Sequence, residues 1–242
     1  MLVAFEGSLG SGKTLGAAMW AWSFTAKFEC HCLSNVALRD EWFAYQRKAR
    51  PDMWNHQLTK PGDFVDLARR GGGVILFDEI HQNLDSRAWA SKNARYWTQF
   101  LMYLRKMNSP MFCTSQSVDH MLDVRVRKVL DLVISCRKTK GGFRYLLWDA
   151  KTGEHHGTRF IPYQVARLFY GFFNTKRIVR PVWFPTTERG YIDFLDALEA
   201  AVIEADTRPL PPVPDLFRML APGEVVAGDY ETRPAVVSLS WD

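Results

Sequence analysis

The sequence predicts an α/β fold with a mainly parallel β-sheet flanked by helices, and three observations predict it. A short apolar run, residues 1–5, leads into a glycine-rich loop that is followed by a helical segment. A second apolar run, residues 73–77, ends in two carboxylates. Two further runs of strand type, residues 111–115 and 131–137, alternate with helical segments. This alternation is typical of parallel sheets, and strands that are apolar on both faces are typical of their interior.

Residues 7–14 have the spacing G-x-x-x-x-G-K-T of a phosphate-binding loop. Glycine lets the backbone turn its N–H groups toward phosphate oxygens, and the following helix adds the positive end of its dipole. The loop residues expected to contact the phosphates of ATP are Gly7, Ser8, Gly10, Ser11 and Gly12. We expect Lys13 to reach the β- and γ-phosphates and the Thr14 hydroxyl to bind Mg²⁺. The alternative is a glycine-rich turn before a core helix.

The two carboxylates after the second apolar run are Asp78 and Glu79. Ligands of open α/β sheets bind at the carboxyl ends of the strands, so both side chains are expected beside the phosphate loop. In that position Asp78 would complete the Mg²⁺ shell, and Glu79 would act as general base for an attacking water. The alternative is a pair of solvated acids at the end of a strand.

Charge is distributed unevenly along the 242 residues. Residues 1–185 carry 27 Lys and Arg against 15 Asp and Glu, a net charge of +12, whereas residues 186–242 carry 4 against 11, a net charge of −7. A basic core is typical of proteins with a polyanionic partner, and nucleic acid is the main candidate. The alternative is a soluble protein with a basic face.

Composition also limits the cellular setting. No run of about 18 apolar residues is present, so we expect no transmembrane helix. We expect no signal peptide either, because the first strand begins at Met1, and we therefore expect a cytoplasmic protein. The four cysteines, at 30, 32, 113 and 136, form no C-x-x-C pair. We expect buried, reduced thiols in preference to a zinc site with His31 or His81.

The remaining elements follow in order along the chain. Helices are expected at residues 40–48, 63–70, 91–107 and 119–130, strands at residues 29–36, 143–149 and 155–161, and irregular structure at residues 51–63. The last two strands would join residues 131–137 in an antiparallel meander at one edge of the sheet. Gln116 follows the strand at 111–115, where it would sense the γ-phosphate or orient water; the alternative is an amide that starts a turn.

The meander and the segment after it carry cations and aromatic residues. Arg137, Arg144 and Arg159 are expected to line one exposed face, as solvated charges or as ligands of a polyanion. The aromatic residues between 163 and 185 are expected to pack on the domain, in preference to stacking on bases. We predict an ATPase domain over residues 1–185, an acidic helix over 186–206 and a Pro-rich acidic tail over 207–242.

Several of these features occur in an order that resembles a known family. The phosphate loop lies close to the start, Ser34–Leu38 follows the first helix, and residues 75–81 read I-L-F-D-E-I-H. The segment 100–116 ends in T-S-Q, and Phe172–Thr175 follows the meander. Over about residues 1–180 the chain resembles the zonular occludens toxin-like ATPases of phages, in the FtsK–HerA branch of additional-strand P-loop ATPases.

The resemblance implies a RecA-like sheet with a catalytic glutamate, a ring-shaped oligomer (a hexamer or pentamer) and ATP-driven movement of DNA. It assigns ATP and Mg²⁺ contacts to Lys13 and Thr14, and it gives Asp78, Glu79 and Gln116 the roles of metal partner, base and sensor. Our first choice for an arginine finger that reaches the next subunit is Arg105, and Arg127 is the second; the alternative for Arg105 is a solvated cation at the end of a helix.

Filamentous-phage members of this family carry a transmembrane helix after the ATPase domain, and we expect none here. We therefore predict an Mg²⁺-dependent ATPase that packages a viral genome, located in the host cytoplasm or at the packaging vertex of the virion. One alternative is a nucleotide-dependent assembly or extrusion factor whose tail binds a capsid or membrane protein. The other is a P-loop small-molecule kinase, which the adjacent acids at 78 and 79 disfavour because a kinase does not activate water.

Overall fold

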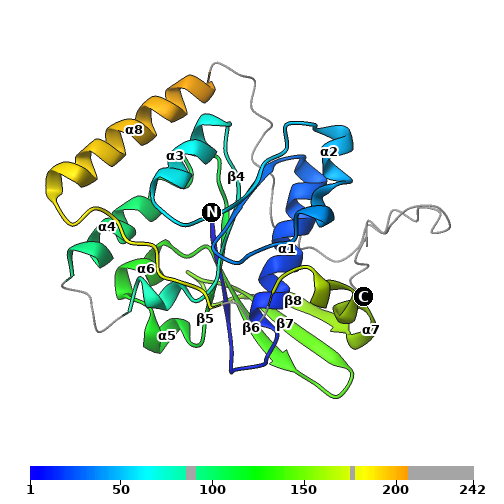
Figure 1. The fold of residues 1–242 in the computed structure, drawn as a ribbon. Coiled ribbons are helices and arrows are strands. Elements are labelled where there is room, and N and C mark those ends of the chain that lie inside the picture. Colours follow the sequence, from blue (N-terminus) through cyan, green and yellow to red (C-terminus); the bar gives the residue numbers. More distant parts are fainter. Residues whose placement is uncertain (86–90, 175–177, 207–242) are drawn as a thin grey trace.

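The computed structural model describes residues 1–85, 91–174 and 178–206, and an eight-stranded sheet forms its centre. The strands are β1 (Leu2–Glu6), β2 (His31–Ser34), β3 (Asn55–Gln57), β4 (Gly73–Phe77), β5 (Met111–Ser115), β6 (Leu132–Lys138), β7 (Gly142–Asp149) and β8 (His155–Pro162). Their order across the sheet is β3-β2-β4-β5-β1-β6-β7-β8. Strands β1 to β6 pair in parallel, and β7 and β8 add an antiparallel meander at one edge (Figure 1). The predicted mainly parallel sheet with an antiparallel edge is confirmed.

Helices cover both faces of this sheet. They are α1 (Lys13–Phe28), α2 (Gln46–Ala49), α3 (Gly62–Arg69), α4 (Lys92–Leu101), α5 (Val118–Met121), α6 (Val124–Val129), α7 (Tyr163–Leu168) and α8 (Glu188–Asp206), with 3₁₀ turns η1 (Asp40–Phe43), η2 (Ile80–Gln82) and η4 (Phe169–Gly171). Alternate residues of β1 face opposite cores. Leu2 and Ala4 pack with α3, α4, α6 and α8, whereas Val3 and Phe5 pack with α1 and η4.

One additional strand separates the two strands that carry the predicted site. β5 lies between β1, which precedes the phosphate loop, and β4, which precedes Asp78. The register places Ser115 beside Glu6 and Cys113 beside Phe77, so the three strands end at the same edge of the sheet. The end of β5 therefore contributes side chains between the loop and Asp78.

Several predicted boundaries are wrong for identifiable reasons. Residues 51–63 are not wholly irregular, because β3 adds to the edge of β2 through backbone bonds such as Leu58 N–H to the Ser34 carbonyl (2.8 Å). The predicted helix over 40–48 is divided into η1 and α2. The predicted helix over 119–130 is divided into α5 and α6, because Asp123 accepts a hydrogen bond from Arg125 N–H (2.8 Å) and starts a new helix. The helix predicted over 91–107 ends at Leu101, followed by turns.

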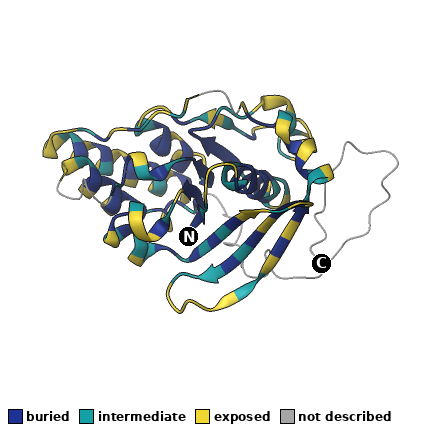
Figure 2. Ribbon diagram, turned by 90° about the horizontal axis from the view of Figure 1, so that it is seen from below, coloured by how far each residue is buried: buried dark blue, intermediate teal, exposed yellow. Residues whose placement is uncertain are grey.

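The meander has one buried face and one exposed face, as the alternating colours of its strands in Figure 2 show. Tyr145 of β7 packs toward α1, while Arg144 and its cross-strand neighbour Arg137 of β6 are exposed on the other face. The prediction that Arg159 shares this exposed face is wrong. Arg159 pairs with Tyr145 in the register and is only 3% exposed, because a shift of one position moves a side chain to the opposite face.

The segment after the meander folds back onto the domain. Phe169, Phe172 and Phe173 are buried beside α1, and Phe184 is buried beside α4, so the packing predicted for the aromatic segment is confirmed for them. Tyr170 and Trp183 are exposed. The acidic helix predicted near the C-terminus is α8, which packs against α3. The predicted tail, residues 207–242, lies outside the described residues. In the described part of the chain, no helix combines the length and apolar character needed to cross a membrane.

Candidate nucleotide-binding site

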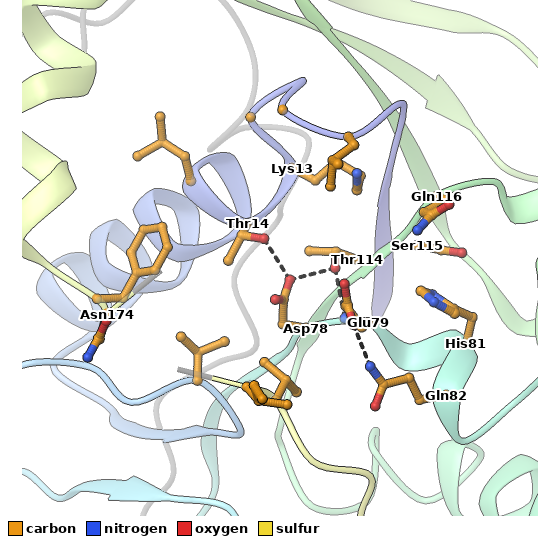
Figure 3. A pocket seen from close by; sticks show the side chains of 18 of the residues that line it. Lys13, Thr14, Asp78, Glu79, His81, Gln82, Thr114, Ser115, Gln116 and Asn174 are labelled. Atoms are coloured by element: carbon orange, nitrogen blue, oxygen red, sulfur yellow. Dashed lines mark hydrogen bonds between the residues drawn. The ribbon is translucent and has the colours of Figure 1, made fainter. Parts of the chain in front are cut away.

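A pocket of about 570 Å³ opens at the carboxyl ends of β1, β4 and β5. The phosphate loop forms one wall, the segment that follows β4 forms a second, and residues 114–116 at the end of β5 form a third. The segment 170–179 contributes a further wall with its residues 170, 173, 174, 178 and 179. The pocket thus brings together Lys13, Thr14, Asp78, Glu79 and Gln116, which lie far apart in the sequence (Figure 3).

Two glycines give the phosphate loop its shape. Gly7 (φ +144°) and Gly12 (φ +89°) adopt backbone conformations that other residues rarely adopt. A Cβ atom at Gly7 would lie 2.5 Å from the Cys136 carbonyl oxygen, and one at Gly12 would lie 2.5 Å from the Phe143 ring. No described side chain caps the N-terminus of α1, and its first residues, Lys13 and Thr14, line the pocket. Such a helix end binds anions.

The other predicted loop residues divide into exposed and buried positions. Ser8 and Gly10 are exposed, whereas Ser11 is buried and its hydroxyl has no hydrogen-bond partner among the described residues. Lys13 lies across the loop mouth, where its Nζ donates to the carbonyl oxygens of Gly7 (2.9 Å) and Ser8 (3.0 Å). The ammonium group is therefore held at the point where phosphate oxygens would enter.

Asp78 is held by hydrogen bonds to both its side chain and its backbone. Its Oδ1 accepts hydrogen bonds from Thr14 Oγ1 (2.8 Å) and Thr114 Oγ1 (2.6 Å). Its backbone is fixed by the side chain of Asn35, which accepts from Asp78 N–H (2.7 Å) and donates to its carbonyl oxygen (2.9 Å). Burial raises the pKa of Asp78, and the bonds from Thr114 and Thr14 act in the opposite direction. The carboxylate is thus placed and oriented by three different elements of the chain.

Glu79 has a different environment from its neighbour. It is half-buried, and its backbone is left-handed (φ 51°, ψ 48°), a conformation that costs a non-glycine residue about 1–3 kcal/mol. The N–H of Glu79 donates to Thr114 Oγ1 (2.9 Å), and its carboxylate accepts a hydrogen bond from the side chain of Gln82. The left-handed turn directs Glu79 into the pocket, beside and not behind Asp78 (Figure 3).

Two further groups lie on the same side of the pocket as Glu79. Gln116 is exposed and lines the pocket, and its carbonyl oxygen accepts from Gly7 N–H (3.3 Å). The ring of His81 also lines the pocket, and its Nδ1 is buried without a hydrogen-bond partner among the described residues. The structure therefore places the predicted sensor at the site and adds a histidine that we had weighed only as a zinc ligand.

Neither of the predicted arginine fingers lines the pocket of its own chain. Arg105 lies in the turns between α4 and β5, near the amino group of Met1. Burial lowers the pKa of this amino group, Asp131 acts in the opposite direction, and Arg105 lowers it further. Arg105 is therefore at the amino edge of the sheet, opposite the site. Arg127 of α6 lies 3.7 Å from Asp119. Because an arginine finger acts on the neighbouring subunit, both assignments stay predictions.

The donor set around Thr14 suits Mg²⁺. Magnesium prefers oxygen ligands and is commonly bound by one or two protein oxygens together with substrate phosphates. The Thr14 hydroxyl donates a hydrogen bond to Asp78 Oδ1, so the lone pairs of Thr14 Oγ1 are directed away from the carboxylate. Thr14 and Asp78 would therefore hold the ion beside the phosphate loop. No cluster of three or more His, Cys, Asp or Glu suited to a metal occurs in residues 1–85, 91–174 and 178–206.

The cysteines are free thiols, as predicted. Cys32, Cys113 and Cys136 are buried, and Cys30 is half-buried. Burial raises the pKa of Cys30 and of Cys113 to about 12, so both carry their protons at neutral pH. The thiols therefore act as small apolar groups and not as nucleophiles.

Sequence reasoning missed four residues that shape the site. Thr114 joins Asp78 to Glu79, and Asn35 fixes the backbone of Asp78. Tyr145 donates from its hydroxyl to the Gly12 carbonyl (3.0 Å), and Glu6 accepts from Val118 N–H and Ser135 Oγ (both 3.0 Å). Thr114 and Asn35 lie in segments quoted for the resemblance, T-S-Q and Ser34–Leu38, but no role was predicted for either of them, and Glu6 was marked only by its position at a strand end.

Comparisons with known proteins are consistent with this geometry. A family model described as zonular occludens toxin (Zot) matches residues 1–174. A search of curated proteins finds no match. Similar solved structures include the N-terminal domain of zonular occludens toxin from Neisseria meningitidis, at 17% identity and a TM-score of 0.42, with 79% of this chain and 96% of that chain covered.

Two other similar solved structures come from a virus and from an archaeon. The genome packaging NTPase B204 of Sulfolobus turreted icosahedral virus 2, in complex with ATP-gammaS, has 12% identity and a TM-score of 0.47 over 66% of this chain and 96% of that chain. The flagellar accessory protein FlaH of Methanocaldococcus jannaschii has 14% identity and a TM-score of 0.39 over 61% of this chain and 76% of that chain. We base no inference on likenesses at this level.

Proposed function

The chain belongs to the zonular occludens toxin family, and on the geometry of its pocket we propose that it is an Mg²⁺-dependent ATPase that moves DNA. The observation that carries the ATPase assignment is the arrangement around Asp78. A buried carboxylate that orients a threonine hydroxyl beside a phosphate loop is suited to holding Mg²⁺ on a nucleoside triphosphate.

In the proposed mechanism each protein group has one task. The loop N–H groups and Lys13 would bind the β- and γ-phosphates, and Thr14, oriented by Asp78, would hold the metal ion. Bound Mg²⁺ would supply charge neutralisation at the phosphates. Glu79 accepts a proton from a water whose oxygen bonds to the γ-phosphorus, while the bond from that phosphorus to the oxygen bridging to the β-phosphate breaks and releases ADP and phosphate. The backbone of Glu79 is held by the hydrogen bond from its N–H to Thr114 Oγ1. Gln116 orients that water or senses the γ-phosphate.

A basic surface on the meander supports DNA as the partner. Arg137 and Arg144 lie directly opposite each other on the exposed face, and like charges in this arrangement repel. In the described part of the chain, neither forms an ion pair. The meander, residues 132–162, contains 6 Lys and Arg against 2 Asp and Glu. DNA phosphates would neutralise this charge.

The basic surface is mechanically connected to the phosphate loop. Tyr145, next to Arg144 on β7, donates to the Gly12 carbonyl, and Phe143 of the same strand lies against Gly12. A movement of β7 on DNA binding would therefore reach the loop directly. We propose that this contact couples hydrolysis to DNA movement in a ring of identical subunits, with Arg105 or Arg127 acting on the neighbouring site. Genome packaging, in the host cytoplasm or at the packaging vertex, is the process we favour.

The experiment that tests DNA movement is displacement of a triplex-forming oligonucleotide from double-stranded DNA. We expect the wild-type protein to displace the oligonucleotide when ATP and Mg²⁺ are present, and Lys13→Ala to fail. A protein that hydrolyses ATP but never displaces the oligonucleotide would contradict the motor.

A second function, as a nucleotide-dependent assembly factor, has one observation in its favour. Ile192 and Ile203 are exposed on the acidic helix α8, where they offer apolar surface to a protein partner. Such a factor would bind ATP and a capsid or membrane protein, and DNA would not change its ATPase rate. Measurement of the rate with and without DNA separates the two functions.

A further inference from the structure

The exposed face of the meander carries aromatic rings as well as arginines, and the function proposed above uses only the arginines. The register aligns Arg137 of β6, Arg144 of β7 and Phe160 of β8 in one row across the three strands. Residues directly opposite each other on neighbouring strands point to the same face of a sheet. Phe160 therefore lies beside the two arginines, and it is 37% exposed. This row combines positive charge with an open aromatic ring.

Two more rings lie further along the same face. Trp148 follows Arg144 by four residues on β7, which corresponds to about 13 Å at the usual rise of a strand, and it points to the same side. It pairs with His155 of β8, with 4.7 Å between the ring centroids. Trp148 is half-buried, and as far as the structure describes the chain it belongs to the core on neither side of the sheet. Its ring is therefore partly open to a ligand.

The charges of the meander are separated along its strands. Lys138 and Lys140, near the turn between β6 and β7, are exposed like the two arginines, and neither forms an ion pair in the described part of the chain. The two carboxylates, Asp149 and Glu154, lie at the opposite end, next to the turn between β7 and β8. Phe160 therefore lies among cations, and the face favours a partner with a negatively charged backbone.

Rings and cations together on an open sheet are suited to a nucleic-acid strand whose bases are unpaired. Each unpaired base has a flat face on which an aromatic ring can stack, while cations bind the phosphates. In a duplex the base faces are already stacked on one another, so a duplex contacts the cations but not the rings. A protein partner fits less well. Among residues 132–162, which the structure describes in full, only Phe160 is a large apolar side chain that is exposed.

We propose that this face binds a single strand of DNA, with bases stacked on Phe160 and Trp148 and phosphates bound by Arg137 and Arg144. The inference rests on the proposed function in moving DNA, and it names the form of DNA for which this face is built. Duplex DNA binds the same face through the cations alone.

Fluorescence anisotropy with the full chain and three labelled probes tests this assignment. The probes are single-stranded oligothymidine, a strand of the same length whose sugars carry no bases, and the duplex of oligothymidine with oligoadenine. We expect Phe160→Ala to weaken binding of oligothymidine about tenfold, because a base loses its stacking partner. Binding of the abasic strand and of the duplex should stay unchanged. Phe160→Tyr keeps the ring and should bind oligothymidine within about twofold of wild type.

Trp183→Ala is the matched control, because Trp183 is an aromatic residue that is 60% exposed and lies outside the meander. It should leave the affinity for all three probes unchanged, whereas Arg144→Glu should weaken the binding of all three. Three outcomes would overturn the strand-binding face while leaving DNA binding through charge intact. These are an unchanged affinity of Phe160→Ala for oligothymidine, an equal loss for oligothymidine and the abasic strand, and wild-type binding of oligothymidine no tighter than of the abasic strand.

Two further outcomes separate this inference from the proposed function. If wild-type protein binds none of the three probes, both the strand-binding face and the proposed DNA partner are wrong. If Phe160→Ala instead lowers the oligomeric mass measured by sedimentation and leaves the affinity for oligothymidine unchanged, Phe160 forms a subunit contact and the strand-binding face is wrong.

Discussion

The parallel part of the sheet and the antiparallel meander present their functional groups in different ways. β1, β4 and β5 are buried on both faces, so only their carboxyl ends are free for polar chemistry. β6, β7 and β8 bury alternate residues and leave one face open. In the first region the functional groups are tightly bonded to one another; in the second, Arg137 and Arg144 are exposed and face each other.

This difference suits the two regions to different functions, chemistry at the strand ends and DNA binding on the meander. A group such as Asp78, fixed by hydrogen bonds from three elements, is suited to chemistry that requires exact placement. Exposed cations that form no ion pair in the described part of the chain are suited to a partner that supplies many negative charges. Substitutions in the parallel region should therefore change turnover, whereas substitutions on the meander face should change DNA binding and leave basal turnover intact.

The largest expected effect is on turnover. Asp78→Asn keeps an oxygen that can accept from Thr14 and Thr114 but removes the negative charge. We expect ATP turnover to fall by about 100-fold or more, because the charge that holds and orients the metal site is lost. A steady-state ATPase assay measures this. A rate within about threefold of wild type would contradict the metal role of Asp78.

The next largest effect is on DNA binding, and it is tested by reversing the charge of two arginines on the meander. Arg137→Glu/Arg144→Glu should weaken DNA binding about tenfold or more at low salt and reduce the slope of log affinity against log salt by about 2. The control, Lys48→Glu/Lys106→Glu, makes the same charge change at two exposed lysines outside the meander. Fluorescence anisotropy with labelled DNA at several salt concentrations measures both. Equal losses in the two variants would mean that net charge, and not this face, binds DNA.

A smaller effect concerns the pH dependence of stability. Burial raises the pKa of Asp78, so its contribution to stability is present at low pH and is lost as the pH rises through the folded-state pKa. Asp78→Asn removes a buried charge, so without nucleotide it should raise the melting temperature at pH 8, with about 2–4 °C corresponding to each kcal/mol gained. The difference from wild type should shrink near pH 4. A difference independent of pH, measured by calorimetry, would exclude titration of Asp78 as its cause.

The smallest expected effect is on the stability of the meander. Arg144→Gln removes one of two like charges that lie directly opposite each other. We expect the free energy of unfolding to rise by about 0.2–1 kcal/mol in the absence of DNA. Urea unfolding at low salt measures this, and high salt should abolish the gain because it screens the repulsion. A loss of stability would mean that Arg144 has a structural role.

The buried parallel strands and the phosphate loop could be predicted because each is encoded by residues that are close together in the sequence. Strands apolar on both faces and the loop between residues 7 and 14 led directly to β1, β4, β5 and the site of Lys13 and Asp78. β3 was missed because Asn55–Gln57 is polar and gains its structure from pairing with β2. Arg159 was placed on the wrong face because the register of β7 with β8, which spacing within one strand does not reveal, decides its direction.

Contacts between residues that are far apart in the sequence were also missed at the site. Thr114 and Asn35 lie in segments quoted for the resemblance, but no role was predicted for them because they act through side-chain hydrogen bonds to residues far away in the chain. Such contacts depend on which strands are neighbours, and here β5 and β2 flank β4. Arg105 was chosen for its place in a resembling motif, and the fold puts it at the opposite edge of the sheet from the pocket of its own chain, so it could act only on the pocket of another subunit.

The measurement that tests the central claim most directly is the steady-state ATPase rate with and without double-stranded DNA, for wild type and Glu79→Gln. We expect DNA to stimulate the wild-type rate and Glu79→Gln to reduce it by about 100-fold or more while the affinity for adenylyl imidodiphosphate is retained. A wild-type rate that DNA does not change, or a Glu79→Gln rate close to wild type, would contradict a DNA-stimulated ATPase that uses Glu79 as its base.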